Sequence, residues 1–146
     1  MRIAEYVFNT EVDTLPLFNT DFEYTYSDIV NEDGTTTRII ESNTKPTLID
    51  FSFKTGLIRV NKLETSKITT CYAMFRSCTN LVYAKITNVS ESRELQGMFM
   101  DCSKLETIEG VELWDTSKNT SCAAMFSGCK KLNNVSFGTT VNMSSL

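Results

Sequence analysis

Three copies of one short motif constrain the fold of this chain of 146 residues more than any other feature. The pattern Met-Phe-x-x-Cys-x-x-Leu begins at Met74, Met98 and Met125, so the copies are 24 and 27 residues apart. A further apolar side chain stands three residues before each Met, at Cys71, Leu95 and Cys122. Self-similarity at such a period predicts repeated units that bury a shared core.

Each copy contains two kinds of hydrophobic pattern. Apolar residues at i, i+3, i+4 and i+7 around Met-Phe are typical of one face of a short helical turn. Residues 81–86, 105–108 and 132–137 then alternate apolar and polar side chains, which predicts a short strand. One such unit cannot bury its apolar face alone, whereas stacked units can. The sequence therefore predicts an α/β solenoid with one short helical turn and one short strand per repeat.

The predicted array is incomplete at both ends. Residues 48–53 alternate like a strand from a degenerate first repeat, and residues 142–146 begin a fourth copy that the sequence does not finish. An array end exposes core side chains. We therefore expect a neighbouring subunit to cover this end, or a natural chain longer than this sequence.

Charge divides the chain near Lys45-Pro46. Residues 1–47 carry three basic and nine acidic groups, a net charge of −6, whereas residues 48–146 carry eleven and nine, a net charge of +2. We predict a β-rich N-terminal cap or attachment module over 1–47, followed by the repeats over 48–146. Within the module, the turn signal at residues 31–34 lies between two strand-like stretches and predicts a hairpin. As an attachment module, it would pair with another chain through strand edges.

The segment Trp-Asp-Thr-Ser-Lys at residues 114–118, which leads into the third Met-Phe motif, resembles the BspA-type leucine-rich repeat. That family includes the Mycoplasma-type lipoprotein repeat of unknown function. Residues 64–67, Glu-Thr-Ser-Lys, echo the same element, whereas the middle copy at 88–94 lacks it. The resemblance covers residues 63–146 well and 1–47 not at all. It implies a short array of leucine-rich repeats with an interaction surface, not a reaction.

The residues that could support catalysis are few. The absence of histidine excludes Ser-His-Asp and Cys-His catalysis and Cys/His zinc sites. The five cysteines could form a disulfide ladder, a metal site or a column of buried thiols. We favour buried thiols, because Leu95 replaces Cys71 in the middle copy and the count is odd. We predict no enzyme, no cofactor and no metal site, and the net charge of −4 argues against nucleic acid as a partner.

The large apolar side chains are predicted to fill the core. The spacing of the Met-Phe pairs with Cys and Leu favours a continuous aromatic and thioether spine over an exposed Met-rich groove. Trp114 has two interpretations, a packed corner before the third motif or an exposed anchor for a partner. The family pattern favours the packed corner.

The exposed side of the predicted strands is the candidate binding face, since residues between the inward-facing ones point to solvent. The residues predicted to form this face are Lys54, Tyr83, Lys85, Thr87, Thr107, Glu109, Asn134 and Ser136.

The sequence thus predicts a non-enzymatic protein-binding or adhesion module at the cell surface or outside the cell. The alternative is a structural component of a phage virion: a fibre, a tail or a capsid decoration. The expected partners are another protein or sister subunits within an oligomer or larger assembly. The sequence contains no run of 18 apolar residues, so no membrane span is predicted. The first residues do not resemble a secretory signal. The missing signal fits the virion alternative better than a free adhesin.

Overall fold

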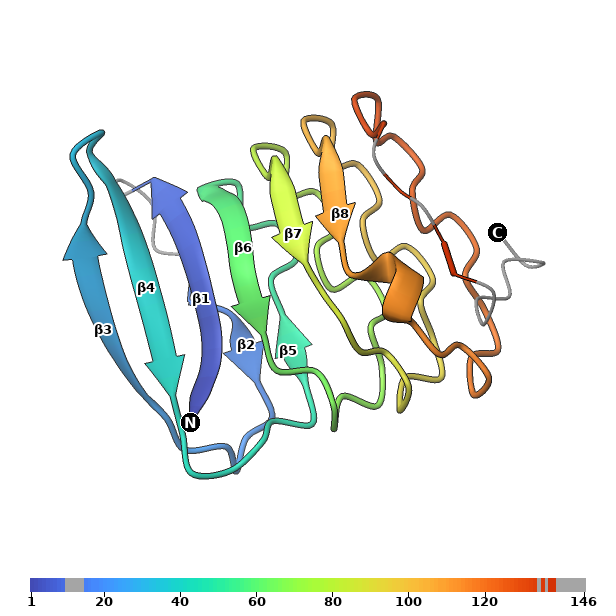
Figure 1. Cartoon of the computed structure of the whole chain (residues 1–146), viewed down its shortest axis with the longest axis horizontal. Coiled ribbons are helices and arrows are strands. Elements are labelled where there is room, and N and C mark those ends of the chain that lie inside the picture. The colour runs from blue at the N-terminus through green and yellow to red at the C-terminus, as the bar shows by residue number, and fades with distance from the viewer. Residues whose placement is uncertain (10–14, 134, 136, 139–146) are drawn as a thin grey trace.

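In the part of the chain that the structure describes, a six-stranded mixed sheet forms the body of the protein (Figure 1). The computed structural model describes residues 1–9, 15–133, 135 and 137–138. The strands follow the order β3-β4-β1-β6-β7-β8 across the sheet. Their bounds are Arg2–Asn9 for β1, Thr25–Val30 for β3, Thr35–Glu41 for β4, Leu57–Leu63 for β6, Tyr83–Lys85 for β7 and Thr107–Glu109 for β8. A second, two-stranded sheet pairs β2 (Leu17–Phe18) with β5 (Ile49–Asp50).

The N-terminal residues supply the antiparallel half of the large sheet. β3 and β4 form the predicted hairpin, and their register runs without a shift from Thr25↔Glu41 to Val30↔Thr36. β1 pairs antiparallel with β4 and also with β6, so hydrogen bonds cross the predicted boundary at residue 47. From β6 onward the pairing is parallel. The two predicted modules therefore share one sheet, although their division into domains stays a prediction.

The predicted α/β solenoid of helical turns is wrong. The described part of the chain is almost entirely β structure and loops, built around a mixed sheet. Its only helical element is the 3₁₀ helix η1 (Val111–Leu113), which lies outside the Met-Phe motifs.

Backbone geometry explains why the Met-Phe segments are not helices. Ala73 and Ser77 flank the first Met-Phe pair with φ values of 52° and 58°, and Gly97 and Asp101 flank the second with 62° and 61°. An α-helix needs φ near −63° at every position. Two left-handed residues four apart therefore replace the helix with a run of tight turns, which also places the residues at i, i+3, i+4 and i+7 in the interior.

Backbone N–H groups in these turns alternate between two kinds of acceptor. The N–H of Arg76 donates to the carbonyl of Ala73 at 3.0 Å, closing a local turn. The neighbouring N–H groups of Phe75 and Ser77 instead donate to Met98 and Met100 in the next repeat, both at 2.8 Å. Each repeat is thus tied to the next along the Met-Phe segment as well as through the sheet.

Stacked phenylalanine rings fill the space between the sheet and the turns. The ring centroids of Phe51 and Phe75 are 5.5 Å apart, those of Phe75 and Phe99 5.2 Å, and those of Phe99 and Phe126 6.1 Å, with interplanar angles of 12°, 7° and 15°. The prediction that Met-Phe pairs form a core spine is confirmed for the first two pairs, since Met74, Phe75, Met98 and Phe99 are all buried. In the third pair Met125 is buried and Phe126 is partly buried.

The predicted first repeat strand at residues 48–53 is placed wrongly. The N–H of Phe51 donates to the carbonyl of Met74 at 2.8 Å, so this segment continues the row of Met-Phe turns. The strand that lines up with β7 in the large sheet is β6. Within residues 48–53, Ile49 pairs with Phe18 in the small sheet and the Phe51 ring stacks on Phe75, whereas Phe53 is 64% exposed.

Replacing Phe99 by Ala should lower the free energy of unfolding by about 3–5 kcal/mol, because the ring is fully buried between two others. Tyr72→Ala is the matched control, since its ring is 52% exposed, and should change stability by no more than about 0.5 kcal/mol. Denaturant unfolding followed by circular dichroism measures both. Equal losses would show that the ring stack does not carry the core.

Candidate binding site on the sheet face

The exposed face of the repeat strands brings together four of the predicted binding residues. Tyr83 and Lys85 on β7 lie opposite Thr107 and Glu109 on β8 in parallel register. The intervening residues Ala84 and Ile108 are buried, so the named side chains all leave the same side of the sheet.

A compact group of interacting side chains lies on this face; we call Arg59, Tyr83, Lys85 and Glu109 the face cluster. The guanidinium carbon of Arg59 is 4.3 Å from the centroid of the Tyr83 ring. The Tyr83 hydroxyl donates a hydrogen bond to the Glu109 carboxylate, and Lys85 Nζ lies 3.1 Å from Glu109 Oε1. Each side chain is thus held by a neighbour from the next strand, which gives an ordered surface of one aromatic ring and three charges.

Sequence reasoning missed Arg59. Its strand was expected at residues 48–53, whereas Arg59 lies on β6 directly opposite Tyr83. The alternation that could have revealed β6 is broken, because Leu57, Val60 and Leu63 are the buried positions. The register of β6 against β1 shifts within this stretch, which accounts for the spacing of three.

The cluster perturbs the proton equilibria of its members. Burial raises the pKa of Tyr83 to about 12, and the hydrogen bond to Glu109 and its negative charge act in the same direction. The hydrogen bonds from Tyr83 and Lys85 lower the pKa of Glu109. At neutral pH the tyrosine is therefore a neutral donor and the glutamate an anion.

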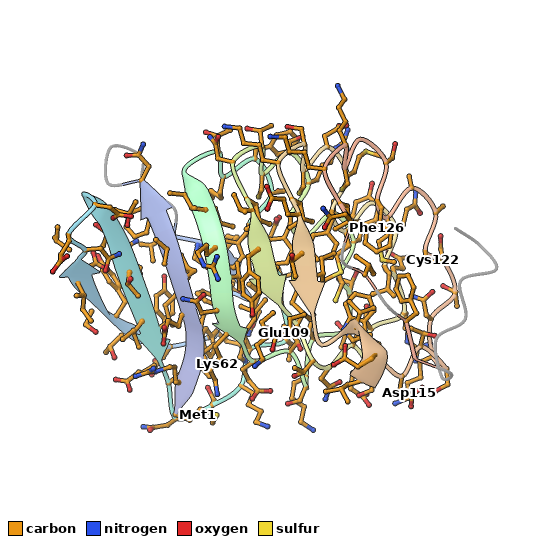
Figure 2. The ribbon with its side chains drawn as sticks, turned by 45° about the horizontal axis from the view of Figure 1, so that its top comes forward. Met1, Lys62, Glu109, Asp115, Cys122 and Phe126 are labelled. Atoms are coloured by element: carbon orange, nitrogen blue, oxygen red, sulfur yellow. The ribbon has the colours of Figure 1, made fainter. Side chains whose placement is uncertain are left out.

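The remaining predicted face residues lie elsewhere. Thr87 is exposed beside the face, in a depression of about 390 Å³ that Lys45, Lys62 and Lys85 also line. Figure 2 shows Lys62 and Glu109 near the same ends of their strands. Lys54 lies in the turn between β5 and β6 and is not part of a strand. Asn134 and Ser136 fall outside the described residues.

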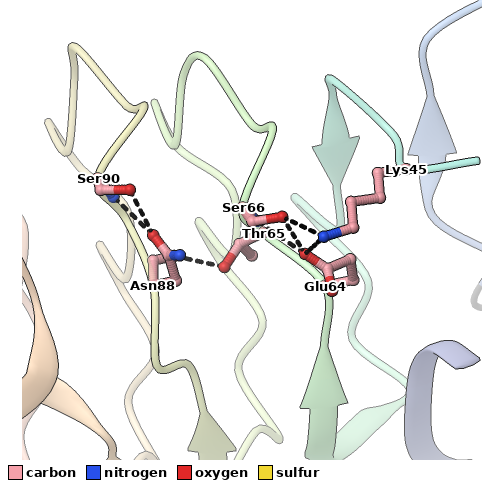
Figure 3. Close-up of polar contacts among 6 residues, drawn as sticks. All are labelled: Lys45, Glu64, Thr65, Ser66, Asn88 and Ser90. Carbon is pink, nitrogen blue, oxygen red and sulfur yellow. Dashed lines mark hydrogen bonds and ion pairs between the residues drawn. The ribbon is translucent and has the colours of Figure 1, made fainter.

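A turn that lines this depression at residues 64–66 recurs at residues 88–90 (Figure 3) and again at residues 115–117. Glu64 Oε1 accepts the N–H of Ser66 at 3.0 Å, and Asn88 Oδ1 accepts the N–H of Ser90 at 2.9 Å. Asp115 Oδ1 accepts the N–H of Ser117 at 2.9 Å in the third copy. The middle copy, which departs from Trp-Asp-Thr-Ser in sequence, therefore keeps the turn, because an asparagine oxygen replaces the carboxylate.

Trp114 occupies a packed corner, as the preferred interpretation predicted. Its side chain is fully buried, and its indole Nε1–H donates to the Ile86 carbonyl at 2.7 Å. The backbone of Gly110 passes so close that a Cβ there would lie 2.7 Å from the same oxygen, and its φ is +96°. This corner supports the fold and offers no exposed anchor.

The thiols serve the stack of repeats. The Sγ atoms of Cys78, Cys102 and Cys129 donate to the carbonyl oxygens of Phe51, Phe75 and Phe99 at 3.1, 3.0 and 3.0 Å. All five cysteines are free, so the disulfide alternative is wrong. Burial raises the pKa of Cys71 to about 11 and that of Cys78 to about 12, which suppresses the nucleophilic thiolate.

Among the described residues no group of three or more His, Cys, Asp or Glu side chains is arranged to hold a metal ion. The same residues include no helix with the length and apolar character needed to cross a membrane.

Comparison with known proteins identifies the family. Residues 49–145 match the family described as Mycoplasma protein of unknown function, DUF285. The match covers most of the chain, so the protein belongs to this family. No curated protein and no solved structure matched the chain.

Native protein should react slowly with a thiol reagent such as Ellman's reagent near pH 8, because burial raises the pKa of Cys71, Cys78 and Cys102 and keeps these thiols protonated. In denaturant all five thiols should react at the rate of a free cysteine. Mass spectrometry after brief labelling measures the reaction at each residue. Rapid native labelling of Cys78 or Cys102 would contradict their structural role.

Replacing Glu109 by Gln should lower the pKa of Tyr83, because the anion that opposes its ionisation is removed. In the wild-type protein Tyr83 should stay protonated at a pH of about 11, where an ordinary tyrosine has ionised. The phenolate absorbance of each protein is compared with that of its Tyr83→Phe counterpart. The same phenolate contribution from Tyr83 with and without Glu109 would show that the two side chains do not interact in solution.

Proposed function

We propose that this protein is a non-enzymatic binding module whose sheet face, centred on the face cluster, contacts a protein partner. The observation that carries the proposal is the ordered group formed by Arg59, Tyr83, Lys85 and Glu109 on the exposed side of three adjacent strands. Tyrosine and arginine are enriched among the residues that dominate binding energy at protein interfaces.

The arrangement of the cluster suits recognition. Tyr83 is held between Arg59 on one strand and Glu109 on another, so little side-chain entropy remains to be lost when a partner docks. The face combines an aromatic ring with charges of both signs, and such a surface favours partners of complementary charge over others. Thr107, which is paired with Tyr83, and Thr87, which lines the depression beside Lys85, would add a polar rim.

The proposal of a binding module rather than an enzyme rests on the chemistry of the side chains. The sequence has no imidazole to act as a general base. Thiols are the strongest nucleophiles in the chain, and those of Cys78, Cys102 and Cys129 donate to backbone carbonyls inside the stack. Tyr83, the polar aromatic group on the face, is held neutral by its raised pKa.

We further propose that the repeats are of the BspA leucine-rich type and that the protein works at a cell surface or outside the cell. The support is the recurrent turn at residues 64–66, 88–90 and 115–117, which accounts physically for the Trp-Asp-Thr-Ser element. The family match over residues 49–145 supports the same assignment at a coarser level.

A displayed random-peptide library, selected on the wild-type protein, tests the face directly. Selected peptides should lose at least about tenfold in affinity on Tyr83→Ala and on Lys85→Ala, because truncation of a central interface residue costs on the order of 1–2 kcal/mol or more. Tyr72→Ala is the matched control, since Tyr72 is an exposed tyrosine on a turn segment. Peptides that bind the Tyr83 and Lys85 variants as tightly as wild type would refute the proposal.

A further inference from the structure

A second surface, distinct from the face cluster, lies at the open edge of the large sheet. Among the described strands, β3 is the first in the sheet order and pairs with β4 alone (Figure 1). All six of its residues are exposed. Three of the exposed side chains are large and apolar or aromatic: Tyr26 is 50% exposed, Ile29 55% and Val30 74%.

The outer side of β3 presents backbone N–H and C=O groups that could pair with a further strand. The N–H of Asn31 donates to the Thr35 carbonyl at 2.8 Å, which fixes the hydrogen-bonding phase of the hairpin. Along an antiparallel strand, successive residues direct their backbone N–H and C=O groups alternately toward the partner strand and away from it. Asn31 is directed toward β4, so the N–H and C=O groups of Tyr26, Asp28 and Val30 point away from β4. Natural edges are usually interrupted by a bulge, a proline or a lysine. β3 has none of these, and its register against β4 is continuous.

The uncompensated charge around this edge has one sign. Residues 21–37 contain five carboxylates and neither Lys nor Arg. Asp28 is paired with Arg38 of β4 at 2.7 Å, so its charge is compensated. Glu23 before the strand and Glu32 and Asp33 after it are exposed, and hydrogen bonds from Thr35 lower the pKa of Asp33. Both ends of an otherwise neutral strand are therefore anionic.

We propose that β3 is a docking edge for an extended cationic segment of a partner protein, which adds to the sheet as a seventh strand. The outward groups of Tyr26, Asp28 and Val30 would supply the backbone hydrogen bonds. Lysine or arginine residues at the two ends of the incoming segment would meet Glu23 at one end and Glu32 and Asp33 at the other. Apolar residues between them would cover Tyr26 and Val30.

The same charges discriminate against a second copy of this chain. In an antiparallel pair of β3 strands, Glu23 of each copy would approach Glu32 and Asp33 of the other. Like charges at close range oppose such a contact, whereas a cationic strand gains from it. The edge is therefore open to strand addition but selective in the charge of the strand.

Two synthetic peptides and two variants test this inference. The probe is acetyl-KKTVTVKK-amide, and its charge-reversed control is acetyl-EETVTVEE-amide, both titrated into the full chain by calorimetry. Val30→Pro removes an N–H that points away from β4, so the hydrogen bonds between β3 and β4 are kept. Val30→Thr is the matched control, because it shortens the apolar surface but keeps the N–H. Thermal unfolding confirms that both variants are folded.

The lysine peptide should bind wild-type protein and Val30→Thr, and binding should weaken about tenfold on Val30→Pro, through one lost hydrogen bond and the obstructing ring. The glutamate peptide should not bind. Equal affinity of the lysine peptide for Val30→Pro would show attraction by charge alone and overturn strand addition. Binding of the glutamate peptide would overturn the charge selection. A dimer of the free protein that Val30→Pro dissociates would assign the edge to a second copy.

Discussion

The hydrogen bonds between successive Met-Phe segments are the constraint on which the other features of the repeats depend. Because the N–H groups of Phe75 and Ser77 donate to the next repeat, they are not available for an internal helix. These hydrogen bonds between repeats also set the separation of neighbouring Met-Phe segments. That separation brings Phe75 and Phe99 into ring contact and places the Cys102 thiol on the Phe75 carbonyl. The core is therefore a consequence of backbone pairing as much as of hydrophobic pattern.

Burial was predictable from the sequence, but the backbone conformation was not. Apolar residues at i, i+3, i+4 and i+7 mark Met74, Phe75 and Cys78 as interior, and they are buried. The same spacing suits either a helix or tandem turns with left-handed residues. Gly97 occupies one left-handed position and signals it, but Ala73 adopts the same conformation without any signal in its residue type. The pattern therefore identifies the face that is buried but does not distinguish the two backbones.

The candidate site was predicted where the strand pattern is regular. Alternation around Ala84 and Ile108 places Tyr83 and Glu109 on the exposed side, and the parallel register of β7 and β8 brings them into contact. Arg59 lies on a strand whose register shifts against β1, so alternation does not identify it. The hairpin of β3 and β4 was predictable because its turn residues define both strands. Its exposure at the sheet edge was not, because strand order depends on contacts between β1 and β6 that are distant in sequence.

The two proposals assign two kinds of recognition to one sheet. The face cluster would recognise side chains, and removal of the Tyr83 ring should therefore change affinity without altering the backbone. The edge would recognise backbone groups, and its dependence on sequence would enter through flanking charges such as Glu23 and Glu32. Because β4 and β1 lie between β3 and β6 in the sheet, a strand added at the edge leaves Arg59 and Tyr83 accessible. Sites this far apart that share no side chain should bind independently, so a partner carrying both complementary elements would gain from their linkage rather than from any change in either site.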